Sequence, residues 1–197
     1  MIRLLLMVML AVGLSACATV EKRIPPQGEA DTRLEHIDGW RLAARFSATS
    51  EDDSWSGTLY WEQSGPRYDI RFLGPLGQGG MRLFGDRGYA TLRLADGRSF
   101  SDDDAEALLR ARSDWRLPLN ALRYWVLGRP APGESQRRLR RDSLGRLQRL
   151  KYADWTVEFR RYSEVDGLQL PAKILLYNPR FEVRLVIDSW ELEFAPT

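Results

Sequence analysis

From Trp40 onward, the apolar residues of the chain recur at every second position. The clearest examples form three stretches, with the apolar or small members Leu42, Ala44, Phe46 and Ala48, then Trp55, Gly57, Leu59 and Trp61, then Tyr68, Ile70 and Phe72. Successive side chains of a strand point to opposite faces, so this period predicts strands with one apolar and one polar face. The chain must therefore form a sheet whose apolar face is covered.

Further strands and turns continue this pattern toward the C-terminus. The predicted strands are Met81–Phe84, Tyr89–Leu94, Arg98–Phe100, Arg137–Arg141, Leu147–Tyr152, Trp155–Arg161, Leu170–Tyr177, Phe181–Asp188 and Trp190–Phe194. Asp96-Gly97 is a two-residue hairpin signal, and Ser64-Gly65-Pro66 is a turn. Because tight turns join consecutive strands, the sheet is predicted to be antiparallel.

Helical signals interrupt the strands at three places. A short helix is predicted at residues 28–37, and Ser101 with Asp104 resembles a capping box before a second helix. A third helix is predicted from Pro118 to Gly128. A long antiparallel sheet with one apolar face has to curl, and the helices can cover its open side. The predicted fold is mainly β with α: a curled antiparallel half-barrel of about 11 strands, closed by a lid of about three helices around an apolar cavity.

The interior of this half-barrel has two interpretations. A curled sheet of this length encloses more volume than a small barrel fills with its own side chains, which favours a cavity. A packed core is the alternative, and the sequence does not decide between them. The inward-facing positions predicted to line a cavity are Phe46, Leu59, Trp61, Tyr68, Ile70, Phe72, Leu122, Trp125, Val157, Ile174, Leu176, Val183 and Leu185.

Residues 1–16 are interpreted as a lipoprotein signal peptide that is removed. The apolar run Leu4–Leu14 is too short for a membrane-spanning helix. Leu14-Ser15-Ala16-Cys17 resembles the bacterial lipobox, which implies cleavage before Cys17, a diacylglycerol on its sulfur and an acyl group on its new amine. A plain signal peptide with a cysteine near the cleavage point is the alternative. Residues 17–30 are predicted to form the lipidated N-terminus and tether, and residues 31–197 a single domain.

Charge and composition argue against several classes of function. The chain has 29 basic and 27 acidic residues, which does not fit a dedicated nucleic-acid binder. One cysteine and one histidine do not make a zinc site, and no Gly-x-Ser-x-Gly elbow is present. The three aspartates at 102–104 are interpreted as helix-start residues rather than metal ligands. No enzyme and no resident cofactor are expected. An anchored enzyme that uses Asp69 or Glu158 is an alternative, although alternation places both on polar faces.

The glycine-rich segment 74–80 carries an apolar residue at its centre. Pro75, Leu76 and Gly77 stand at the tip of a turn, where a leucine cannot be buried by its own loop. The leucine either folds back onto the sheet or forms part of a protruding apolar loop that contacts lipid.

Basic residues also cluster between Arg137 and Arg149. This run is interpreted as a solvated strand face. Contact with anionic headgroups or with an acidic partner is the alternative.

An ordered set of short sequence pieces resembles the LolB family of outer-membrane lipoprotein receptors. The pieces are the lipobox at Cys17, Tyr60–Gly65 with Arg67-Tyr68, Pro75–Gly77, Asp103–Glu106, Leu117–Arg123, Trp125–Pro130, Leu170–Ala172 and Asp188–Trp190. They span essentially the whole mature chain. The soluble carrier LolA shares the fold but lacks a lipobox, so Cys17 favours LolB. Gly74 departs from the pattern, because some relatives carry a polar residue such as Asn there.

The resemblance implies a receptor that accepts lipoproteins from LolA in a hydrophobic cavity. It would insert them into the inner leaflet of the outer membrane, with Leu76 at the position of the family's membrane-inserting leucine. The expected partners of this monomer are a LolA-like periplasmic carrier, acylated lipoproteins and outer-membrane phospholipid. Ala18, where Asp would signal inner-membrane retention, implies lipid anchoring at the outer membrane of a Gram-negative bacterium, facing the periplasm. The alternative is a lipid-anchored structural or envelope-assembly protein with a packed core and no ligand.

Overall fold

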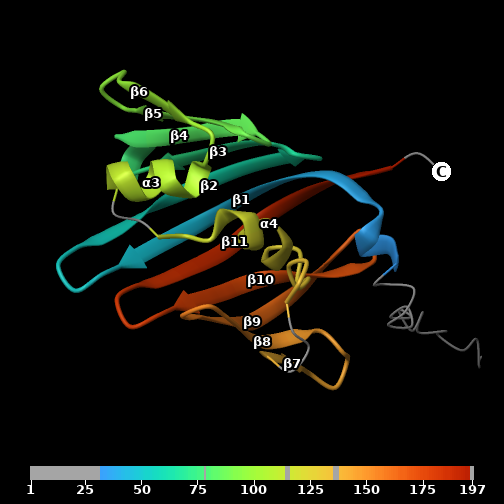
Figure 1. Ribbon diagram of the computed structural model, residues 1–197. Coiled ribbons are helices and arrows are strands. Elements are labelled where there is room, and N and C mark those ends of the chain that lie inside the picture. Colours follow the sequence, from blue (N-terminus) through green and yellow to red (C-terminus); the bar gives the residue numbers. More distant parts are fainter. Residues whose placement is uncertain (1–31, 78, 114–115, 135–137, 196–197) are drawn as a thin grey trace, which may run out of the picture.

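The computed structural model describes residues 32–77, 79–113, 116–134 and 138–195. Its main element is one 11-stranded sheet in the order β6-β5-β4-β3-β2-β1-β11-β10-β9-β8-β7 (Figure 1). The strands are β1 (Ile37–Thr49), β2 (Ser54–Ser64), β3 (Arg67–Leu73), β4 (Gly80–Asp86), β5 (Tyr89–Leu94), β6 (Ser99–Asp102), β7 (Leu139–Arg141), β8 (Leu147–Tyr152), β9 (Trp155–Val165), β10 (Leu168–Tyr177) and β11 (Glu182–Phe194).

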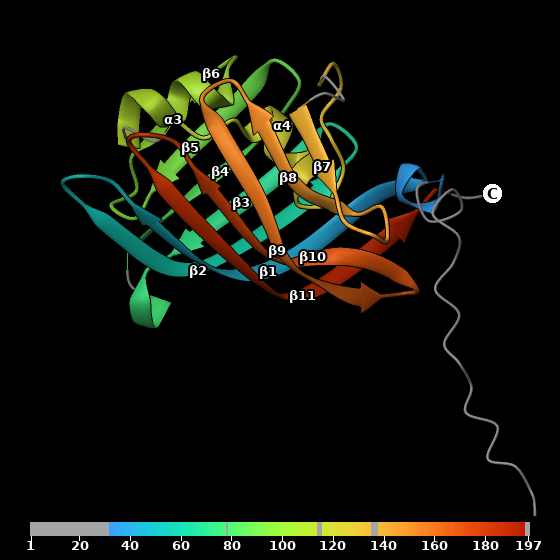
Figure 2. The same cartoon turned by 90° about the horizontal axis from the view of Figure 1, so that it is seen from below.

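The sheet consists of two meanders that meet at its centre. The first and last strands, β1 and β11, pair antiparallel, so β6 and β7 lie at the two outer edges. The chain must therefore cross from one edge to the other between them. This crossing contains helices α3 (Ala105–Ser113) and α4 (Leu119–Trp125), and both helices lie over the concave face of the curled sheet (Figure 2). The predicted half-barrel with a helical lid is confirmed.

The alternating pattern of the sequence becomes one continuous apolar face. Leu42 lies opposite Trp61, which lies opposite Ile70, and the row continues through Leu83 and Leu92 across five paired strands. All five side chains are buried. Direct cross-strand neighbours contact one another on one face, so this row joins β1–β5 into a single wall of the interior.

Two predicted strands, Phe181–Asp188 and Trp190–Phe194, form the single strand β11. In the pairing of β1 with β11, the register shifts between Ala43 and Ala44. This shift accommodates Asp188 as an extra residue of β11 without ending the strand. A bulge of this kind adds a residue to one strand and leaves the ladder continuous on both sides. The prediction of two strands here was therefore wrong.

The predicted helix starts also need correction. Within the described part of residues 28–37, residues 32–35 are helical, whereas Ile37 already belongs to β1 and pairs with Phe194. The cap of α3 is Asp104 and not Ser101, because the Asp104 carboxylate accepts hydrogen bonds from the backbone N–H groups of Glu106 (2.8 Å) and Ala107 (3.2 Å). Asp104 directly precedes the first residue of α3, where an N-cap side chain can reach these N–H groups, whereas Ser101 is held in β6.

Candidate functional site

An apolar cavity lies between the concave face and the lid. Every residue that lines it is apolar: Phe46, Ala48, Leu59, Trp61, Ile70, Phe72, Leu117, Leu119, Leu122, Val183 and Leu185. Strands β1, β2, β3 and β11 supply its floor, and Leu117 with α4 supplies its roof. The cavity measures about 20 Å³, which is room for about one water molecule. The structure therefore shows a closed form, in which the cavity is too small to hold an acyl chain.

The predicted lining residues fall into two groups. Those that surround this cavity are Phe46, Leu59, Trp61, Ile70, Phe72, Leu122, Val183 and Leu185. The others are not in its wall: Val157, Ile174, Leu176 and Trp125 are fully buried elsewhere in the core, and Tyr68 is partly buried. The ring of Trp125 lies against β8, 5.4 Å from the ring of Tyr152. The predicted lining omitted the roof residues Leu117 and Leu119, which lie outside the strands, and Ala48, which alternation had placed on the apolar face.

The lid is fastened by polar contacts at its ends. Trp125 Nε1 donates a 2.8 Å hydrogen bond to a carboxylate oxygen of Glu134, in the loop that follows α4. The first turn of α4 is capped from α3, where Glu106 accepts a 2.9 Å hydrogen bond from the backbone N–H of Asn120. Arg129 donates to the carbonyl of Leu34 at 3.1 Å. Burial raises the pKa of Glu134, and the Trp125 hydrogen bond offsets only part of this shift.

Glu134→Gln is expected to change how the melting temperature of the protein depends on pH. The raised pKa means that the folded state disfavours the carboxylate form; this cost is present above the folded-state pKa and vanishes below the ordinary value of about 4.3. The melting temperature of the variant should exceed that of the parent by roughly 2 °C at neutral pH, and the two should match in acid. Calorimetric scans at both pH values measure this. An equal gain in acid would contradict the assignment.

The loop between β3 and β4 carries the most exposed large apolar side chain described. Leu76 lies in the short turn η1 (Pro75–Gly77), is 96% exposed and has a φ of 60°. This turn projects from the face of the sheet opposite the lid helices (Figure 2, green). The interpretation in which Leu76 folds back onto the sheet is wrong. A non-glycine residue at positive φ costs about 1–2 kcal/mol, so the loop keeps a leucine where glycine or asparagine would suit the backbone better.

A second cavity adjoins this loop. It measures about 300 Å³ and is lined by Phe46, Ser54, Trp55, Ser56, Phe72, Leu73, Gly74, Pro75, Gly79 and Gly80. Phe46 and Phe72 line both cavities, and their rings pack edge to face with centroids 5.4 Å apart. Only this aromatic pair is common to the two linings, so apolar side chains continue from the closed cavity to the base of the Leu76 loop.

The candidate catalytic carboxylates do not converge. Asp69 pairs with Arg82, and Glu158 forms ion pairs with Arg149 and Arg160, both on the polar face of the sheet. Asp102 accepts a hydrogen bond from the backbone of Asp104 at the start of α3. Among the residues with described positions, no group of three or more histidine, cysteine, aspartate or glutamate side chains could hold a metal ion.

Other sequence predictions concern regions outside this site. Cys17 and the tether lie outside the described residues. Arg137 also lies outside them, while Arg140 and Arg141 are exposed on β7. In the part of the chain that the structure describes, no helix is long and apolar enough to cross a membrane.

Comparison with known proteins agrees with this architecture. Residues 38–190 match the family described as outer membrane lipoprotein LolB. The chain is 37% identical over 196 residues to the outer-membrane lipoprotein LolB of Nitrosococcus oceani, covering 96% of this chain and 98% of the relative. It is 39% identical over 186 residues to LolB of Pseudomonas aeruginosa, with 90% of each chain covered.

Two solved structures share the fold at low sequence identity. A DUF1329 family protein from Desulfovibrio piger aligns with a TM-score of 0.56 and 12% identity, over 89% of this chain and 96% of that one. A LolA superfamily protein from Nitrosomonas europaea aligns with a TM-score of 0.50 and 9% identity, over 88% and 96%. The sequence matches extend over nearly the whole chain, and the chain therefore belongs to the LolB family of outer-membrane lipoproteins.

Proposed function

We propose that this protein receives acylated lipoproteins from a LolA-like periplasmic carrier and inserts them into the phospholipid of the outer membrane. The observation that carries the proposal is the wholly apolar lining of the cavity beneath the lid. An acyl chain gains about 0.8 kcal/mol for each methylene that leaves water, so it must pass from one apolar shelter to the next. Membership of the LolB family supports the same role.

The transfer runs without a nucleotide in this proposal. Cargo moves from carrier to receptor to bilayer because each site binds the acyl chains more strongly than the one before. The anchor on Cys17, with its diacylglycerol and N-acyl group, holds the receptor beside the membrane and raises its local concentration there. A single chain suffices, because one copy contributes both the cavity and the Leu76 loop. No chemical conversion is required of it.

The transfer step is tested with the chain from Ala18 onward, which contains the whole described domain. A LolA-like carrier loaded with a fluorescently acylated lipoprotein is mixed with this chain, and the two proteins are separated and assayed for cargo. We expect cargo to move to the receptor. Leu122→Asn, which places an amide in the cavity roof without a hydrogen-bond partner, is expected to lower uptake about tenfold or more.

Leu144→Asn is the matched control, because it makes the same substitution at an exposed leucine outside the cavity. It should accept cargo like the parent. Equal uptake by both variants, or no movement of cargo to the parent, would reject the proposal.

The small size of the closed cavity keeps one alternative in view, a lipid-anchored structural protein with a packed core. Such a protein would not bind an environment-sensitive apolar dye. Saturable dye binding that Leu122→Asn weakens and Leu144→Asn does not would exclude this alternative.

A further inference from the structure

Three arginines lie side by side on the outer face of the sheet. Arg71 on β3 is directly opposite Arg82 on β4, which is directly opposite Arg93 on β5. All three residues are exposed. Like charges directly opposite one another destabilise a sheet, so a row of three carries a cost that folding alone does not explain.

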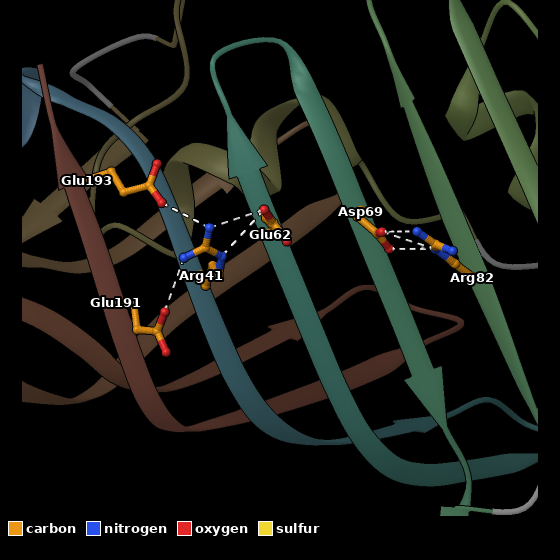
Figure 3. A network of polar contacts seen from close by, with 6 residues as sticks. All are labelled: Arg41, Glu62, Asp69, Arg82, Glu191 and Glu193. Atoms are coloured by element: carbon orange, nitrogen blue, oxygen red, sulfur yellow. Dashed lines mark hydrogen bonds and ion pairs between the residues drawn. The ribbon is translucent and has the colours of Figure 1, made fainter.

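Carboxylates neutralise only the middle arginine of this row. Arg82 makes a bidentate contact with Asp69, with Nε at 3.0 Å from Oδ1 (Figure 3). Arg71 and Arg93 have no ion pair with a described carboxylate. Arg71 lies over the ring of Tyr60 at 5.5 Å, and Arg93 lies 5.8 Å from the centroid of Phe84. Two cations therefore stay available to an external anion.

The neighbouring row shows the contrast. In it, each residue lies directly opposite the next one on the neighbouring strand. The order across β11, β1, β2 and β3 is Glu191, Arg41, Glu62 and Asp69. Arg41 pairs with Glu62 at 3.4 Å and with Glu191 at 3.3 Å, and Arg82 reaches over to Asp69 (Figure 3). The carboxylates of this row are each matched by an arginine, and none of them faces Arg71 or Arg93 directly.

The arginine row is the one closer to Leu76. Leu73 and Gly80 form the last strand pair before the loop, and Arg71 with Arg82 lies two residues further along the same strands, about 7 Å away. The loop projects from this same outer face, opposite the lid (Figure 2). An apolar tip with exposed cations beside its base is the arrangement that fits the headgroup layer of a bilayer.

We propose that Arg71, Arg82 and Arg93 form a docking face for anionic phospholipid headgroups, which holds the outer face against the membrane while Leu76 enters it. This face deepens the proposed membrane step and rests on Leu76 reaching a bilayer. Its test measures vesicle binding without cargo, so failure of the docking face and failure of lipoprotein transfer are distinguished.

The test compares binding of the chain from Ala18 onward to vesicles of phosphatidylcholine alone and to vesicles in which about a third of the lipid is phosphatidylglycerol. We expect tighter binding to the anionic vesicles, and we expect salt to abolish this difference. An arginine near an anionic surface contributes about fivefold in affinity. Arg71→Gln with Arg93→Gln should therefore weaken binding to anionic vesicles about 30-fold and leave binding to neutral vesicles unchanged.

Arg161→Gln with Arg180→Gln is the matched control, because it removes the same charge from exposed positions outside both the arginine row and the basic run at Arg137–Arg149. It should retain tight binding. Arg71→Lys with Arg93→Lys keeps the positive charge, so this variant should retain most of the affinity for anionic vesicles. It thereby separates an effect of lost charge from an effect of disturbed folding. Equal losses in the two glutamine pairs, or equal binding of the parent to both vesicles, would overturn the proposal. So would normal vesicle binding combined with slower uptake from the carrier, because the row would then contact a protein.

Discussion

Leu76→Glu is expected to reduce insertion of lipoprotein into vesicles by roughly 100- to 1000-fold. A leucine and an acidic side chain differ by about 3–4 kcal/mol on a membrane-insertion scale, which corresponds to that range. Since the Leu76 side chain makes almost no contact with the rest of the protein, the melting temperature should change by no more than about 2 °C. Uptake from the carrier should be unchanged. The measurement is the fraction of cargo that floats with vesicles over time.

Two further substitutions at this position separate hydrophobicity from charge. Leu76→Asn removes the apolar side chain without adding a charge, and asparagine tolerates the positive φ of this residue. It should impair insertion while leaving the fold as stable as the parent or slightly more so. Leu76→Met keeps an apolar tip and should insert cargo normally. Normal insertion by the asparagine variant would show that the loop does not enter the membrane.

Trp125→Ala is expected to lower the melting temperature by about 10 °C, the largest stability change proposed for a single substitution here. Removing a fully buried tryptophan costs about 3–5 kcal/mol, and each kcal/mol shifts the melting temperature of a chain this size by roughly 2–4 °C. The variant also leaves the Glu134 carboxylate without its indole donor. Because Trp125 fixes α4 to β8, the loosened lid should bind an apolar dye faster than the parent does.

Trp55→Ala supplies the comparison, because Trp55 is 44% exposed at the start of β2. It should shift the melting temperature by only a few degrees at most. Trp125→Phe retains most of the apolar volume and should fall between the two alanine variants. Similar melting temperatures for Trp125→Ala and Trp55→Ala would contradict the role assigned to the lid anchor.

The sheet could be predicted because alternation reports which face of a strand is apolar. It correctly placed Leu59, Ile70 and Leu185 inside the half-barrel. It could not report where along that face the lid leaves space, so Ile174 and Leu176 were assigned to the cavity although both lie in the filled part of the core. The position of this space depends on how the lid packs against distant parts of the sheet.

Contacts between segments far apart in the sequence could not be predicted either, because they also depend on long-range packing. Glu134 lies in a loop without a periodic pattern, and its role appears only when Trp125 is placed beside it. The arginine row depends on the register of β3, β4 and β5, which turn lengths fix but single-strand patterns do not show. By contrast, the exposure of Leu76 was one of two open interpretations, because an apolar residue between proline and glycine has little local cover.

The crossing from β6 to β7 has a mechanical consequence. It is continuous with both edge strands, so the segment that covers the cavity also links the two edges of the sheet. Displacement of this segment is therefore expected to move both outer strands together. Occupancy of the cavity and curvature of the sheet are therefore expected to change together.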